Sequence, residues 1–138
     1  MCSIVETQKE IINDFEMFES WTEKYEYLID LGKNLPEIQE RYKTDKFLIK
    51  GCQSRVWLHA EEKNGKIIYT ADSDAIMTKG IVSLLISVLS HQDPSEIASV
   101  KLNFIKKIGL QEQLSATRAN GLNSMIKQMK LYALIYVK

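Results

Sequence analysis

The chain has 138 residues, with 18 basic and 18 acidic side chains and therefore no formal net charge. This length is typical of one domain, and a hydrophobic content of 45% is enough for a buried core. The charge balance argues against a partner, such as nucleic acid, that is bound through a uniformly basic surface. We therefore expect one domain over residues 1–138 and no nucleic-acid partner.

The cysteine count excludes further classes of protein. Cys2 and Cys52 do not make a disulfide framework, and they are too few for a four-cysteine zinc or iron–sulfur site. The N-terminus lacks the basic start and apolar run of a secretory signal, and no apolar stretch is long enough to span a membrane. The sequence thus predicts a cytoplasmic protein with reduced thiols and no membrane partner.

The first third of the chain predicts two helices. Ser3 with Glu6, and Ser20 with Glu23, have the spacing of capping boxes, and each pair precedes a stretch with apolar residues at helical spacing. Gly32 is expected to end the second helix in a left-handed conformation. Residues 36–38 are expected to form one short helical turn after Pro36.

The middle of the chain changes from helical spacing to alternation. Arg55–Ala60 and Ile67–Ala71 are predicted strands, and the dipeptide Asn64-Gly65 between them favours a two-residue hairpin turn. Phe47–Ile49 is expected to pair as a third strand. This arrangement leaves Gly51–Ser54 at the bend between two strands.

The remaining chain is predicted to be helical. A broad apolar face from Ile76 to Leu89 indicates a central buried helix, and Asp93-Pro94 starts a short helix. Another helix is expected from Asn103 to Ile108, and a long one from about Ser115. The fold class is therefore α+β, with a small antiparallel β-meander of about three strands packed against several helices.

Cys52 is the first candidate for chemistry. It follows Gly51, which allows a sharp turn, and it lies near Lys50 and Arg55, whose positive charges are expected to favour the thiolate. A thiolate is the form that attacks sulfur. The alternative is that Cys52 is a small buried apolar residue.

Two other kinds of site involve residues elsewhere in the chain. A metal site would need Cys52, His59, Asp72 and Asp74 to converge, but both aspartates are better interpreted as helix caps. A cysteine hydrolase would need a base such as His59, and neither its spacing nor that of His91 specifies a dyad.

Arg118 follows Ser115, the expected cap of the last helix. A cation in the first turn is unfavourable beside the helix dipole, so Arg118 is either a surface charge or an anchor for a carboxylate or a neighbouring loop.

Four separated segments resemble motifs of the SufE family in order and spacing. They are Trp21–Pro36, Gly51–Trp57, Asp72–Gly80 and Gly109–Leu122. The second segment, Gly51-Cys52-Gln53-Ser54-x-Val56-Trp57, is similar to the motif around the active cysteine of that family. Ala116 departs from the pattern, since a proline is common there.

The resemblance implies a fold shared with IscU-type scaffolds and a role as sulfur acceptor. By this resemblance, Cys52 accepts sulfane sulfur from a SufS-type cysteine desulfurase, which the protein activates, and passes it on to a SufBCD-type scaffold complex. Gly51, Gln53 and Ser54 belong to the loop of the thiol, while Asp74 and Arg118 are expected to hold that loop or to meet the partner. The pyridoxal phosphate (PLP) belongs to the desulfurase, and the chain itself is expected to need no cofactor and no metal.

Several alternatives remain open. The chain is expected to act as a carrier and not as a stand-alone metabolic enzyme, but it could instead activate the desulfurase as a regulatory binding module without covalent transfer. The motifs do not separate a SufS-type from a CsdA-type desulfurase as the partner. They also leave open whether the protein forms a homodimer. Cys2 is expected to be incidental.

Overall fold

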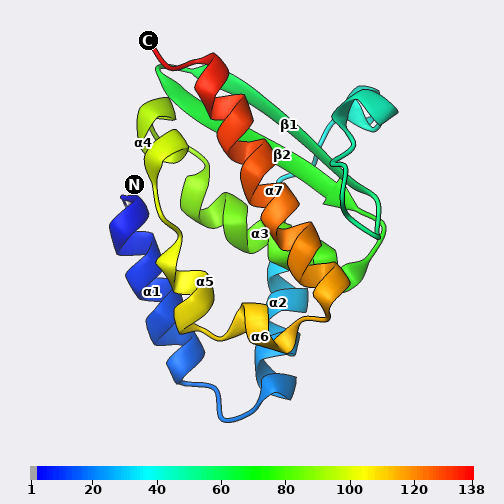
Figure 1. Ribbon diagram of the computed structural model, residues 1–138, viewed down its shortest axis with the longest axis vertical. Coiled ribbons are helices and arrows are strands. Elements are labelled where there is room, and N and C mark those ends of the chain that lie inside the picture. The colour runs from blue at the N-terminus through cyan, green and yellow to red at the C-terminus, as the bar shows by residue number, and fades with distance from the viewer. Residues whose placement is uncertain (1–2) are drawn as a thin grey trace.

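A computed structural model describes residues 3–138, which form seven α-helices around a two-stranded antiparallel sheet. The fold is α+β, as predicted (Figure 1). In chain order the elements are α1 (Ile4–Glu16), α2 (Trp21–Lys33), the 3₁₀ turns η1 (Glu40–Tyr42) and η2 (Asp45–Phe47), β1 (Val56–Lys63), β2 (Lys66–Ser73), α3 (Ile76–Leu89), α4 (Pro94–Ser99), α5 (Asn103–Lys107), α6 (Leu110–Gln113) and α7 (Ala116–Ile135). Within the described residues, no helix has the length and apolar character needed to cross a membrane.

The two N-terminal helices begin at the predicted caps. The hydroxyls of Ser3 and Ser20 accept hydrogen bonds from the amides of Glu6 and Glu23, at 3.1 and 3.2 Å. The predicted C-terminal role of Gly32 is wrong, because Gly32 lies inside α2 and the helix continues to Lys33.

The hairpin between the strands has the predicted turn. Lys63 pairs with Lys66, and Asn64 and Gly65 between them have φ angles of 53° and 77°, as a type I′ turn requires. The expected third strand, Phe47–Ile49, is reduced to a single antiparallel bridge between Leu48 and Trp57. Since the preceding residues are coiled into η2, little extended chain remains to pair, and the count of about three strands was too high.

The segment after α2 also differs from the prediction. No helical turn forms over residues 36–38. Instead, Glu37 makes a parallel bridge to Ala71 of β2. The outer edge of β2 offers unpaired backbone groups, and the extended segment satisfies some of them.

One face of the hairpin is buried in the core that α3 and α7 share. Its apolar members are Val56, Leu58, Ala60, Ile67, Tyr69 and Ala71. Two tyrosine hydroxyls tie α7 to this sheet. Tyr69 donates a hydrogen bond to the Met129 carbonyl at 2.6 Å, and Tyr132 donates one to the Leu58 carbonyl at 3.2 Å.

The C-terminal helices largely follow the prediction. Asp93 caps α4 by accepting a hydrogen bond from the Ser95 amide, and Ser115 caps α7 by accepting one from the Arg118 amide. The α3 helix is buried along most of its length, as its broad apolar face predicts. The short helix α6 was not predicted.

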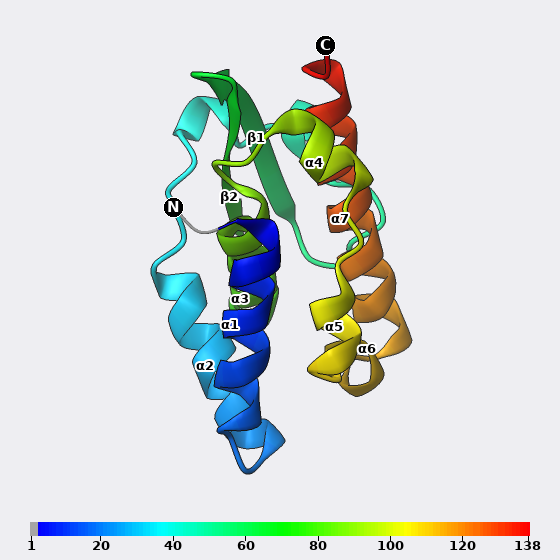
Figure 2. The ribbon, with the colours of Figure 1, turned by 90° about the vertical axis from the view of Figure 1, so that its left-hand side faces the viewer.

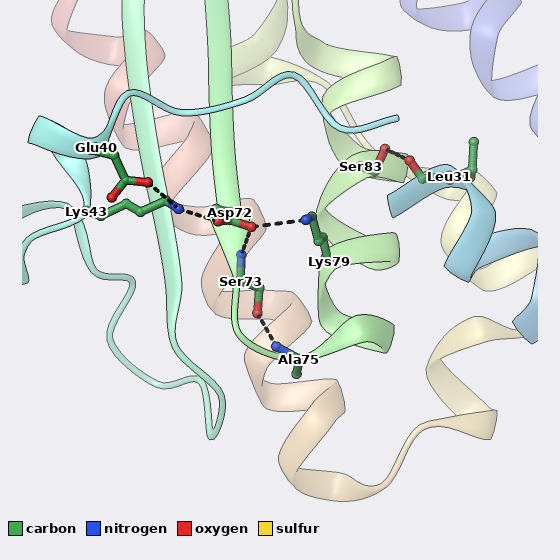
Figure 3. Close-up of polar contacts among 8 residues, drawn as sticks. All are labelled: Leu31, Glu40, Lys43, Asp72, Ser73, Ala75, Lys79 and Ser83. Carbon is green, nitrogen blue, oxygen red and sulfur yellow. Dashed lines mark hydrogen bonds and ion pairs between the residues drawn. The ribbon is translucent and has the colours of Figure 1, made fainter. Parts of the chain in front are cut away.

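The α2 and α3 helices cross at very close range because glycines face each other. A β-carbon added at Gly80 would collide with the Leu28 carbonyl, and one added at Gly32 would lie 3.0 Å from the Gly80 nitrogen. Next to this crossing, the Ser83 hydroxyl donates a hydrogen bond to the Leu31 carbonyl at 2.9 Å (Figure 3). The crossing therefore depends on the absence of a side chain at Gly80.

Replacing Gly80 with alanine is expected to lower the free energy of unfolding by about 1–3 kcal/mol, the usual cost of overpacking. At an exposed helical position the same change would stabilise the protein by about 1 kcal/mol. Urea denaturation of wild type and Gly80→Ala measures the difference. Ser87→Ala, at an exposed position of the same helix, is the control, and a Gly80→Ala protein more stable than wild type would contradict the packing argument.

Candidate functional site

Cys52 lies in a short loop whose two ends are held together. The Ile49 amide donates a hydrogen bond to the Val56 carbonyl at 2.8 Å, and residues 50–55 project beyond this closure. Gly51 has a φ angle of 94°, which L-amino acids with side chains rarely adopt. The backbone therefore turns sharply one residue before the thiol.

The loop lies directly on α7. A β-carbon at Gly51 would be only 2.5 Å from the hydroxyl of Ser124, and one at Gly121 would be 3.5 Å from the sulfur of Cys52. The Cys52 thiol points toward the helix backbone, where it donates a hydrogen bond to the Gly121 carbonyl at 3.6 Å. The half-buried thiol is thus sheltered against a helix surface that has no side chain at this point.

A small cavity of about 60 Å³ adjoins the thiol. Cys52, Gln53 and Ser54 form its loop side, while α3 and α7 supply the rest. The residues from these helices are Thr78, Ile81, Thr117, Arg118, Gly121 and Met125. The structure thus brings Cys52, Gln53, Ser54 and Arg118 together around one space.

Burial raises the pKa of the Cys52 thiol above its ordinary value. The expectation that Lys50 and Arg55 favour the thiolate is therefore wrong for this conformation. Both residues are exposed, and solvent screens their charges from the thiol. At neutral pH the sheltered cysteine is a protonated thiol, so its activation requires a change in its surroundings.

Asp74 connects the end of the loop to the start of α3. Its carboxylate accepts a hydrogen bond from the Arg55 amide at 3.0 Å, and its own amide donates one to the Arg55 carbonyl at 3.3 Å. Its predicted role as a helix cap is wrong, because α3 is preceded by Ala75 and has no side-chain cap. Asp74 instead fixes the backbone three residues after Cys52.

Asp72 does not cap the helix either. It joins three segments through ion pairs, with Lys43 at 2.7 Å and Lys79 at 3.4 Å (Figure 3). Partial burial alone would raise the pKa of Asp72, but hydrogen bonds from Lys43 and the Ser73 amide, together with the charge of Lys79, hold it below the usual value. This network links the segment before the loop to α3.

Arg118 lies in the first turn of α7, at the edge of the cavity that Cys52 also lines. Among residues 3–138 its guanidinium makes no hydrogen bond or ion pair, and the side chain is exposed. The structure thus leaves a charged group beside the thiol available to a molecule that approaches from solvent.

The histidines lie in other environments. His59 stacks on Tyr42 with 3.7 Å between ring centroids, and burial lowers the pKa of its imidazole. His91 follows α3 and lines a different pocket from Cys52. In the described residues, no three His, Cys, Asp or Glu side chains are grouped as a metal site requires. Cys2 lies outside the described residues.

Of the helix side of this site, only Arg118 is predicted from the sequence. Gly121 was noted as part of a motif, but its contact with the thiol was not expected. A glycine in the middle of a long helix is a signal that could have indicated this contact, since glycine costs stability there unless something approaches closely. Thr78, Ile81 and Met125 carried no comparable signal.

Comparisons with known proteins are consistent with the motifs. A family model for SufE, described as the Fe-S metabolism associated domain, matches residues 9–133. The chain is 40% identical over 126 residues to a SufE-like protein of Rhizobium meliloti (strain 1021), covering 88% of this chain and 90% of that protein. A SufE-like protein of Synechocystis is 36% identical over 126 residues, covering 91% of this chain and 79% of the relative.

A plant relative is considerably longer. SufE-like protein 1, chloroplastic/mitochondrial, of Arabidopsis thaliana is 40% identical over 129 residues, which are 91% of this chain but 34% of that protein. The solution structure of a hypothetical protein from Thermus thermophilus has the same fold, with a TM-score of 0.79 over 94% of this chain and 95% of that one, at 18% identity. From the family match along nearly its whole length, the chain belongs to the SufE family, the domain associated with Fe-S metabolism.

Proposed function

We propose that the protein accepts sulfane sulfur on Cys52 from a cysteine desulfurase, which it thereby activates, and passes the sulfur on for iron–sulfur cluster assembly. The observation that carries the proposal is the position of Cys52. This chain belongs to the SufE family, and its Cys52 lies on a loop that begins with a glycine. The thiol donates a hydrogen bond to the backbone of α7 and adjoins a small cavity. The protein is then a carrier that relays sulfur.

The reaction is an exchange of sulfur between two thiols. The Cys52 thiolate attacks the terminal sulfur of the donor's cysteine persulfide, and a new S–S bond forms on Cys52. The S–S bond of the donor breaks, and the donor cysteine leaves as a thiolate. No net oxidation occurs, and the proton lost by Cys52 balances the proton that the donor thiolate takes up.

The geometry at rest suits a carrier that protects its thiol. A protonated, half-buried thiol reacts slowly with oxidants and stray electrophiles. The adjoining space of about 60 Å³ is larger than the roughly 15 Å³ that one water molecule needs, so it can hold one added sulfur atom. The persulfide could therefore occupy the same shelter during transport.

Transfer requires the loop to leave α7. The loop is held on α7 by the hydrogen bond from Cys52 to the Gly121 carbonyl and by the packing of Gly51 on Ser124, and its end is held by the hydrogen bonds between Asp74 and Arg55. Partner binding that displaces the loop would remove the burial that keeps the thiol protonated. Arg118, whose guanidinium is unpaired within residues 3–138, could meet a carboxylate of the partner as the loop moves out.

The proposed donor is a SufS-type desulfurase, which carries the PLP, and the proposed acceptor is a SufBCD-type scaffold complex. The cytoplasm is the proposed compartment. These assignments rest on family membership and on the motifs around Cys52, and a CsdA-type desulfurase is the other donor to include in any assay.

Sulfur transfer is expected to add the mass of one sulfur atom to wild type and none to Cys52→Ser, after incubation with desulfurase and cysteine. Serine keeps the size of the side chain but cannot form a persulfide. Intact mass spectrometry without reductant measures the gain. Equal labelling of both proteins, or labelling of neither, would contradict the proposal.

The same variant distinguishes the regulatory alternative. If Cys52→Ser stimulates the desulfurase over many turnovers as strongly as wild type does, activation occurs without covalent transfer. Under the proposed relay, stimulation by Cys52→Ser is largely lost. Cys2→Ser serves as the matched cysteine control and is expected to transfer sulfur normally.

The sheltered thiol is also expected to be alkylated slowly at neutral pH. The measurement uses the Cys2→Ser variant, in which Cys52 is the remaining cysteine. Its rate of alkylation by iodoacetamide should rise with pH, and the midpoint of that rise should lie at a higher pH in the folded protein than in urea, because burial raises the pKa of Cys52. Asp74→Ala removes the hydrogen bond to Arg55 and is expected to accelerate alkylation about fivefold, since one hydrogen bond contributes about 1 kcal/mol.

Asp93→Ala, which removes the cap of α4, is the control for that experiment and should leave the alkylation rate unchanged. If alkylation of the folded protein has its midpoint at a lower pH than alkylation of the unfolded chain, the thiol is already activated at rest, which would contradict the effect of burial on its pKa.

A further inference from the structure

A second hollow lies on the other side of the Cys52 loop. It has a volume of about 550 Å³ and runs between residues 45–50 and the middle of α7. Lys50 lines this groove and Cys52 lines the small cavity, so only Gly51 separates the two along the chain. Gly51 packs on Ser124, which also lines the groove. We refer to this hollow as the lysine groove.

The groove combines positive charge with apolar surface. Lys46, Lys50 and Lys127 line it, with Phe47 and Leu131 among its apolar members. The three lysines are exposed, and among residues 3–138 none of them forms a salt bridge. Asp45 also lines the groove, so two net positive charges remain unneutralised.

Although the chain has no formal net charge, its acidic and basic residues are distributed unevenly over the molecule. Residues 3–32, which contain α1 and most of α2, have eight carboxylates and two lysines. The α7 helix has Arg118, Lys127 and Lys130 and no carboxylate. Figure 2 shows α1 and α2 on one side of the molecule and α7 on the other. The face that carries Cys52 is therefore the basic one.

We infer that the lysine groove binds an acidic, partly apolar segment of the protein that exchanges sulfur with Cys52. The inference rests on the proposed sulfur transfer for the identity of that partner. Three ammonium groups without a salt bridge attract carboxylates at long range and orient the approach of the partner. Phe47 and Leu131 offer apolar contact to the same segment once it is bound. A segment in this groove would lie against Lys50 and Ser124, next to the point where Gly51 packs on α7, and could there displace the loop.

Nucleic acid fits the groove less well. Three lysines provide few phosphate contacts, and the acidic α1 and α2 helices repel a polyanion that extends around the molecule. The acidic helices of a second copy are another conceivable occupant. Binding of nucleic acid in the groove, or self-association through it, would count against the inference.

The test compares two double variants with the same change in net charge. Lys46→Glu/Lys127→Glu reverses the groove but leaves Lys50 intact, so the immediate neighbours of Cys52 are unchanged. Lys63→Glu/Lys66→Glu reverses two exposed lysines at the hairpin end that make no salt bridge within residues 3–138. Thermal unfolding of both variants establishes that they remain folded, as expected for exposed positions.

The first probe is a fluorescein-labelled peptide of about ten residues in which glutamate and leucine alternate. Fluorescence anisotropy at low salt is expected to show binding to wild type and to the hairpin variant. The groove variant should bind about tenfold more weakly, and salt should weaken wild-type binding. Equal affinity of both variants would overturn the inference, as would tighter binding of a labelled single-stranded oligonucleotide than of the peptide.

The second probe is a SufS-type desulfurase. The groove variant is expected to need about tenfold more protein for half-maximal stimulation, with the maximal rate retained, because the charges act on association. Persulfide formation on Cys52 from inorganic polysulfide should be unaffected. If wild type gains no sulfur from the desulfurase, the proposed function fails, and the peptide experiment still decides about the groove.

Sedimentation velocity completes the test. A wild-type dimer that dissociates in the groove variant would assign the groove to the acidic helices of a second copy and would overturn the inference of a separate acidic partner. A monomer in all three proteins supports it.

Discussion

The site depends on how closely one loop approaches one helix. The Cys52 loop can lie on α7 because Gly51, with a φ angle of 94°, has no side chain to collide with Ser124, and Gly121 leaves helix backbone facing the thiol. The thiol is therefore sheltered by helix backbone, and no polar side chain is needed to hold it. The α7 helix packs on the sheet through its buried apolar residues, and the hydroxyls of Tyr69 and Tyr132 add two hydrogen bonds between them. Burial of the hairpin face and shelter of the cysteine are thus parts of one packing arrangement.

This arrangement favours the protonated thiol while the loop lies on α7. Burial raises the pKa of Cys52, while the cations nearest in sequence remain in solvent. The Asp72 ion pairs and the hydrogen bonds between Asp74 and Arg55 anchor the chain on either side of the loop. A loop with fixed ends and a weakly held tip can be displaced without disturbing the core.

Much of the fold could be predicted from local chemistry. The serine caps, the Asn64-Gly65 turn and the apolar face of α3 depend on neighbouring residues, and each is formed as predicted. The failures depend on residues distant in sequence. Gly32 lies within its helix and packs against Gly80 of α3, and Glu37 is extended because it pairs with the edge of β2. The third strand is reduced because the residues before Leu48 form a 3₁₀ turn.

The site likewise combines features that depend on neighbouring residues with features that depend on contacts between residues distant in sequence. The loop position of Cys52 followed from the predicted strands around it, whereas the roles of Asp74 and Gly121 depend on long-range contacts. Lys50 and Arg55 show the converse, because proximity in sequence suggested an effect on the thiol that exposure removes. The resemblance to SufE motifs identified the family without revealing these contacts.

The closure of the loop at its base limits how far the Cys52 thiol can extend from the domain. The hydrogen bond between Ile49 and Val56 leaves Cys52 three residues from the nearer anchor. A fully extended chain spans at most about 3.4 Å per residue, so the backbone at Cys52 can reach roughly 10 Å from the base of the loop. A donor whose persulfide lies deeper than this must admit the base of the loop into its entrance. The length of the tether thus sets a maximum depth for any partner pocket that this protein can serve.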